Sequence, residues 1–328
     1  MNYIIKSEYA GKTVKEFLKN EVKPSNKLLA LLKNRDNGIL VNHRRVTVRH
    51  ILSSGDVLSL NYEDDNNREN INIVPNDSLL KSIDIIYEDD YMIAVDKPYG
   101  MPSHPSLNHF DDTLANAVTA YFKNKNQVIN FRSVNRLDKN TSGIVLIAKN
   151  KMISAKLNDL IKTGNIKKIY KAIITGNIDC CEQEKINNDL KTVGGLFCYD
   201  KNTKTGQITA PIKREKESII KRICSADGDS SKTDFQVLRI SEDKKLCYLE
   251  IYPLTGRTHQ IRVHFHSIGY PLLGDDLYFI EGATVYKNNI IKRHALHASS
   301  IEFVHPMTRD NINISCELCE DMKLGFLY

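Results

Sequence analysis

The chain has 328 residues, of which 41% are hydrophobic and 26% charged, a composition typical of an ordinary globular protein. This length exceeds that of one small domain, so we expect one large and one small domain. The sequence has neither an apolar run of about 18 residues nor a signal-peptide pattern at its start, which excludes a typical membrane-spanning helix and predicts a cytoplasmic protein.

The positive charge is concentrated near the N-terminus. Residues 1–60 carry 11 Lys and Arg against 5 Asp and Glu, so this block holds the whole excess of +6. A compact basic module on a neutral body is typical of a protein that binds a phosphate backbone. Charge alone leaves open a Lys-rich face that serves only solubility.

The first 60 residues have the pattern of a small α/β module. The expected elements are helices around Val14–Leu18 and Leu28–Leu32, strands at Gly38–Asn42, Val46–Val48 and Val57–Leu60, and a basic turn at His43-Arg44-Arg45. The Asn- and Asp-rich stretch that follows is typical of a linker. We therefore expect a domain at 1–62, a linker at 63–78 and a second domain at 79–328.

From residue 79 onward the pattern predicts an α+β domain. The expected strands are Ile83–Tyr87, Met92–Val95, Gly143–Ala148, Ile166–Thr175, Leu246–Tyr252 and Ala298–Val304, and the expected helices are Leu114–Tyr121, Met152–Ile161 and Thr258–Ile268. Asp111-Asp112 and Thr258 are candidate N-caps. Residues 177–231 have no clear period and are interpreted as an insertion or a mobile arm.

The segment from Asn135 to Gly143 is the most informative in the chain. Arg136 and Asp138 lie two residues apart on a Ser/Thr/Gly turn that leads into an apolar strand. The turn fixes the backbone and the strand anchors it. An aspartate held in this way can act as a nucleophile if a cation keeps it ionised, whereas the alternative is a solvated surface charge pair.

Three further segments carry candidate functional residues. Residues 96–105 contain three prolines and a glycine, which predict a rigid loop. On the expected strand Ile166–Thr175, Lys168 and Tyr170 share one face, an arrangement suited to a stacked base and its phosphate. Arg262 lies beside the apolar stripe of the last predicted helix, where it can reach inward to an anion.

Metal and nucleotide signals are weak or absent. Cys316 and Cys319 form a single C-x-x-C, without the second pair that a zinc site needs. The histidines at 259, 264 and 266 lack the i, i+4 spacing of a zinc helix. The sequence also lacks G-x-G-x-x-G and P-loop patterns.

Taken together, these segments resemble the RluA-type family of pseudouridine synthases. The matching stretches are RLDKNTSG, GRTHQIRVH, DKPYGMPSH, KIYKAIITG and PLLGDDLY. The N-terminal block is similar to the S4-like RNA-binding domain in its two helices and in VNHRRV and SGDVLSL. The resemblance implies a pseudouridine synthase fold, with a mainly antiparallel mixed sheet flanked by helices, beside a small α/β module. Asn135 departs from the family pattern, which usually has histidine there.

The resemblance also implies an activity and a set of roles. The family isomerises uridine in folded ribosomal or transfer RNA, and Asp138 matches the aspartate that either attacks C1′ or removes the C2′ proton. Arg262 matches the residue that holds this carboxylate charged, and Tyr170 the residue that stacks on the flipped uracil near the C5 proton. Arg136 matches the side chain that fills the gap left by the flipped nucleotide. The resemblance also implies that no metal, nucleotide or redox cofactor is needed, which agrees with the absence of nucleotide-binding patterns.

Lys168, Arg257, Arg44 and Arg45 are expected to contact RNA. We expect a monomer that needs no protein partner. One alternative is an RNA-binding protein that has this fold and no activity. A second alternative is a different nucleic-acid enzyme, such as a nuclease or a deaminase. It would need clustered carboxylates for magnesium or a zinc motif, and the sequence shows neither.

Overall fold

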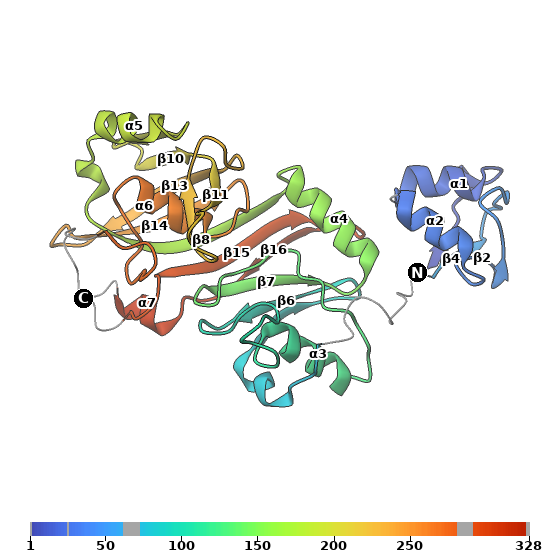
Figure 1. The fold of residues 1–328 in the computed structure, drawn as a ribbon. Coiled ribbons are helices and arrows are strands. Elements are labelled where there is room, and N and C mark those ends of the chain that lie inside the picture. Colours follow the sequence, from blue (N-terminus) through green and yellow to red (C-terminus); the bar gives the residue numbers. More distant parts are fainter. Residues whose placement is uncertain (1, 25, 62–72, 281–290, 326–328) are drawn as a thin grey trace.

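The computed structural model describes residues 2–24, 26–61, 73–280 and 291–325. The N-terminal module packs short helices on a four-stranded antiparallel sheet of order β1-β4-β2-β3 (Figure 1). Its elements are β1 (Asn2–Ile4), α1 (Val14–Phe17), a π-helical turn (Leu18–Val22), α2 (Asn26–Asn34), β2 (Ile39–Val41), β3 (Arg44–Arg45) and β4 (Val57–Leu60). Val14, Phe17 and Leu58 are buried in its core, as amphipathic elements require.

The basic segment of this module is a strand and not the predicted turn. Asn42 and His43 both have positive φ, 48° and 67°, and form the two residues of a tight hairpin turn. Arg44 and Arg45 therefore pair with β2 as β3, with both side chains exposed. The strand expected at Val46–Val48 is absent because the chain turns away there.

The second part of the chain is built on one ten-stranded sheet of order β5-β6-β7-β15-β8-β14-β13-β10-β9, with β16 beside β15. In chain order, the strands are β5 (Asp84–Glu88), β6 (Met92–Lys97), β7 (Ser142–Ala148), β8 (Ile166–Thr175), β9 (Leu196–Asp200), β10 (Thr205–Thr209), β13 (Lys232–Ile240), β14 (Leu246–Pro253), β15 (Leu296–Val304) and β16 (Asn311–Ser315). Among the described pairs, β7 with β15 is parallel and the others in this sheet are antiparallel. The predicted mixed, mainly antiparallel sheet is confirmed.

Helices cover this sheet at several places (Figure 1). They are α3 (Leu114–Asn124), α4 (Lys151–Lys162), α5 (Gln183–Lys191), α6 (Gln260–Ser267) and α7 (Glu320–Gly325). The α3 helix lies on the β6 side, whereas α5 and α6 lie near β10 and β13. Lys156 on α4 donates to the Val22 carbonyl oxygen at 2.8 Å, which connects the N-terminal module to the large domain. Within the described part of the chain, no helix combines the length and apolar character needed to cross a membrane.

Residues 177–231 are regular, in contrast to the predicted arm. They form α5, then β9 and β10, which extend the central sheet, and a hairpin of β11 (Ile212–Arg214) and β12 (Arg222–Cys224). Phe197 and Ile208 bury their side chains in the main core. The strands are short and their apolar residues are few, so the sequence pattern is weak.

Several element boundaries also differ from the predictions. The cap of α3 is Thr113, whose hydroxyl accepts from the Asn116 amide, and not Asp111-Asp112. The cap of α6 is His259 and not Thr258. Most of the expected linker lies outside the described residues, and its last residues begin a 3-10 helix at Asp77–Ser82. The sequence pattern predicts neither β13 nor β16.

Gly143 joins the candidate active-site loop to the sheet. It has φ +108°, and a Cβ there would clash with the backbone carbonyl of Ala298, its partner in the parallel β7–β15 ladder. Any side chain at this position would therefore push β7 away from β15. The glycine in the RLDKNTSG stretch is a packing requirement at the base of the loop.

We expect Gly143→Ala to destabilise the protein more than Gly100→Ala. Both glycines have positive φ, which costs a non-glycine residue about 1–2 kcal/mol, but nothing lies within 4 Å of a Cβ at Gly100. Urea unfolding of the two variants separates backbone strain from the clash with Ala298. Equal losses of unfolding free energy would contradict this interpretation.

Candidate active site

Asp138 lies at the end of a loop that the sheet holds in place. The Asn135 side chain acts as a short strand partner for β7, because its amide donates to the Ile144 carbonyl at 2.9 Å and its oxygen accepts from the Leu146 amide at 2.8 Å. The Thr141 amide then donates to the Asp138 carbonyl at 3.1 Å, closing a turn immediately before β7. These bonds fix the backbone on both sides of the carboxylate.

A buried lysine ties two loops together beneath Asp138. The Lys97 ammonium donates to the carbonyl oxygens of Pro98 at 2.8 Å, Met101 at 2.8 Å and Lys139 at 3.2 Å. Burial lowers the pKa of Lys97 to about 7, against the opposing effect of the Asp138 carboxylate. Three acceptors require all three N–H groups, so the ammonium form is the one that completes this arrangement.

Arg262 connects two carboxylates. Its Nε and Nη2 donate to the two oxygens of Asp275, at 2.7 and 2.8 Å, and its Nη1 donates to Asp138 Oδ2 at 3.0 Å. The Asp275 side chain is fully buried, and its Oδ1 also accepts from the amides of Leu277 and Tyr278. Arg262 is thus held in one orientation, with one N–H pointing at Asp138.

The electrostatics of this group favour ionised side chains. Burial acts to raise the pKa of Asp275, but its hydrogen bonds and charge interaction with Arg262 outweigh burial and leave the pKa below its ordinary value. Burial likewise opposes the charged form of Arg262, and Asp275 and Asp138 raise its pKa above the ordinary value. Arg262 therefore remains a cation beside Asp138.

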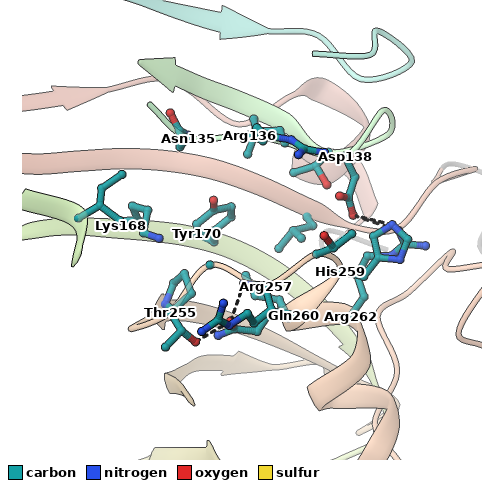
Figure 2. A pocket seen from close by; sticks show the side chains of 18 of the residues that line it. Asn135, Arg136, Asp138, Lys168, Tyr170, Thr255, Arg257, His259, Gln260 and Arg262 are labelled. Atoms are coloured by element: carbon teal, nitrogen blue, oxygen red, sulfur yellow. Dashed lines mark hydrogen bonds and ion pairs between the residues drawn. The ribbon is translucent and has the colours of Figure 1, made fainter. Parts of the chain in front are cut away.

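Asp138 faces a pocket of about 280 Å³ between β8 and the segment that precedes α6. Figure 2 shows Arg136 and Asp138 along one side, Thr255, Arg257 and Gln260 along the other, and Lys168 and Tyr170 between them. Burial, together with the Asp138 carboxylate, raises the pKa of Tyr170, so its phenol stays protonated. Burial lowers the pKa of Lys168. The pocket thus offers a carboxylate, an aromatic ring and cations.

The wall opposite Asp138 is held by Gln260. Its side-chain oxygen accepts from the Thr255 hydroxyl at 2.6 Å and the Arg257 amide at 3.0 Å. Its amide donates to the Lys232 carbonyl and the Thr233 hydroxyl. Arg257 lies on this fixed wall with an exposed side chain, 3.7 Å from Asp229.

Six of the eight residues predicted for the site line this one pocket. They are Asp138, Tyr170, Arg262, Arg136, Lys168 and Arg257. Arg44 and Arg45 lie apart from it, on β3 of the N-terminal module. The segments at 135–138, 168–170 and 255–262 are far apart in the chain and meet here because β8 pairs with β14, which leads toward α6.

Sequence reasoning gave no role to Asp275, Lys97 or His259. Asp275 lies in the matched PLLGDDLY stretch and Lys97 in DKPYGMPSH. Neither stretch contains the partner, because Arg262 is 13 residues from Asp275 and Lys139 is 42 residues from Lys97. His264 is satisfied within the fold, because its ring contacts the Thr233 hydroxyl and the Ala210 carbonyl. Within the described ranges, no group of three or more His, Cys, Asp or Glu could hold a metal ion.

Known proteins share both the sequence and the fold. A family model described as RNA pseudouridylate synthase matches residues 91–267. The uncharacterized RNA pseudouridine synthase YjbO of Bacillus subtilis is 32% identical over 311 residues, which cover 95% of this chain and 97% of that protein. The ribosomal large subunit pseudouridine synthase D of Buchnera aphidicola is 35% identical over 259 residues, covering 75% of this chain and 73% of the relative.

A solved structure of human RNA pseudouridylate synthase domain containing 1 has the same fold. Its TM-score is 0.55, with 21% identity, over 75% of this chain and 89% of that chain. The sequence matches and the motifs around the pocket agree with this similarity. The chain belongs to the RluA-type family of RNA pseudouridine synthases, which are isomerases.

Proposed function

We propose that this protein converts specific uridines in structured ribosomal or transfer RNA to pseudouridine, with Asp138 as the catalytic carboxylate. The observation that carries the proposal is the pairing of Asp138 Oδ2 with Arg262 Nη1 at 3.0 Å, at the edge of a pocket that also contains Tyr170. The pairing places a guanidinium beside the carboxylate at the edge of a pocket of about 280 Å³.

The reaction breaks the N1–C1′ bond of uridine and forms a C5–C1′ bond, after which C5 loses its proton and N1 carries one. Asp138 serves this isomerisation in one of two ways, by attack at C1′ or by removal of the C2′ proton. Carboxylates act comparably on sugar carbons in glycosidases, although here the base is retained and turned.

The other pocket residues suit a nucleotide taken out of its stack. Tyr170 offers a ring for the uracil and a protonated phenol near the site of the final proton transfer. Arg136 is exposed at the rim, in a position to replace the flipped nucleotide in the RNA. Lys168 and Arg257 are the cations proposed to meet phosphates, an interaction that fixes register.

The N-terminal module is proposed to be a second RNA contact, of the S4-like type. Its whole excess of +6 and the exposed Arg44 and Arg45 on β3 support this role. A basic module beside the catalytic domain increases affinity for folded RNA without entering the reaction.

Ribosomal RNA and transfer RNA both remain within the proposal. The name of the Buchnera relative indicates a ribosomal large subunit substrate for that protein. We propose that this chain works as a cytoplasmic monomer, without an obligate protein partner or cofactor. Retention of Asp138, Tyr170 and Arg262 in one pocket supports an active enzyme over an RNA-binding protein that has lost its chemistry.

Asp138→Asn is expected to abolish pseudouridine formation and to preserve RNA binding. The substitution keeps the size of the side chain and removes the charged oxygen that the chemistry requires. Pseudouridine mapping of cellular RNA, with and without the wild-type chain, would identify the substrate for this assay. Asp90→Asn, at an exposed turn, is the matched control and should be active. Turnover by Asp138→Asn near the wild-type rate would refute the proposed role.

Replacing Arg44 and Arg45 together by alanine should weaken RNA binding and reduce its salt dependence. Each lost phosphate contact removes slightly less than one unit from the slope of log affinity against log salt. The rate at saturating substrate should change little, because Asp138, Tyr170 and Arg262 are untouched. The measurement is affinity at several salt concentrations, and an unchanged slope would show that these arginines do not contact RNA.

A further inference from the structure

His259 has a backbone conformation that few residues other than glycine adopt. It is the N-cap of α6, yet its φ of 57° and ψ of 18° lie in the left-handed region, and its side chain makes no capping hydrogen bond. Among residues other than glycine, histidine adopts this conformation more often than most, as asparagine and aspartate do, but it still carries a steric cost. The side chain is nearly buried, 10% exposed, and lines the pocket beside Asp138 (Figure 2). Strain of this kind is frequent where a side chain has a functional direction.

A buried tyrosine fixes the orientation of the ring. The Tyr278 hydroxyl lies 2.8 Å from His259 Nδ1 and accepts a hydrogen bond from the Arg222 amide at 2.9 Å. Because that amide already donates to the oxygen, the arrangement that satisfies all groups has the phenol donating its proton to Nδ1. The proton of the neutral imidazole is then on Nε2.

This tautomer directs an N–H group at Asp138. Nε2 is 3.7 Å from Asp138 Oδ2, the same oxygen that Arg262 Nη1 contacts at 3.0 Å. Within the described residues, no hydrogen bond or ion pair engages Asp138 Oδ1. Burial lowers the pKa of His259, against the opposing effect of Asp138, so the ring is a neutral donor. Catalytic hydrogen bonds are often long before substrate binds and shorten in the complex.

We propose that His259 is a positioning residue for Asp138, donating from Nε2 to Oδ2 so that two donors fix this oxygen and Oδ1 is presented to the ribose. The proposal rests on the proposed catalytic role of Asp138. It adds a second, neutral contact to the charged one from Arg262. The rotation of the Asp138 carboxylate is then fixed by two donors, Arg262 and His259, that approach from different directions, and not by a single ion pair.

Two amide substitutions separate this role from a simple helix cap. The side-chain nitrogen of glutamine occupies a position similar to Nε2, whereas that of asparagine corresponds to Nδ1. Asparagine is the better residue for a left-handed cap. If His259 acts only as the left-handed cap of α6, the His259→Asn variant should therefore be at least as active and as stable as His259→Gln.

We expect the opposite order for the single-turnover rate at saturating RNA. His259→Asn should lose about 10- to 100-fold, the range for one lost hydrogen bond to a charged group, and His259→Gln should lose clearly less. The RNA dissociation constant should stay near wild type for both. His266→Gln, on the same helix with its ring on the Tyr278 carbonyl, is the matched control and should keep the wild-type rate.

Tyr278→Phe provides a second test that leaves His259 in place. Loss of the hydroxyl that orients the His259 ring should lower the single-turnover rate of the otherwise wild-type protein. The same substitution should cause no further loss of rate in the His259→Gln variant. Three results for the single-turnover rate would overturn the proposal. They are equal losses in His259→Asn and His259→Gln, no loss in His259→Asn, and a loss in His266→Gln equal to that in His259→Asn. Activity in Asp138→Asn would instead overturn the proposed function, so the two failures are distinguishable.

Discussion

The charge arrangement Asp275–Arg262–Asp138 is the interaction on which the site depends. One carboxylate does not satisfy a buried arginine, because the guanidinium has five N–H groups in a fixed plane. Asp275 takes two of them, and the remaining direction is set toward Asp138. Because Asp275 is itself held by two backbone amides, the position of the candidate catalytic carboxylate is determined by a chain of contacts that begins in the main chain.

The central sheet fixes the backbone of the loop that carries Asp138. Gly143 allows β7 to approach β15, Asn135 binds the preceding loop to β7, and Lys97 closes the loop from below. Arg293 extends this support to the C-terminal helix, because it donates to the Asn140 carbonyl and pairs with Asp321 of α7. Asp138 is therefore fixed through its backbone by one part of the chain and through its side chain by another.

The sequence predicted the site better than it predicted the elements around it. Alternation on β8 placed Lys168 and Tyr170 on one face, and the apolar stripe of α6 placed Arg262 inward, because both periods are strong in those segments. The structured region at 177–231 was missed because its strands are short. The longer strand β13, which follows it, was also missed, although its Thr233, Phe235 and Val237 alternate in burial with their neighbours. Asp275 and Lys97 were not assigned roles because Arg262 and Lys139 lie in other stretches, 13 and 42 residues away, and a sequence pattern does not show which side chains meet.

The most direct test of this account is the single-turnover rate of Asp275→Asn. The amide cannot accept from both nitrogens of Arg262 as the carboxylate does, so the guanidinium should lose its fixed direction while the pocket lining stays intact. The account predicts a rate at saturating RNA reduced about tenfold or more, consistent with loss of hydrogen bonds to a charged group, with RNA affinity near wild type. Asp276→Asn, at the exposed neighbouring position, should keep the wild-type rate. A folded Asp275→Asn protein with the wild-type rate would contradict the claim that Asp275 positions the catalytic carboxylate through Arg262.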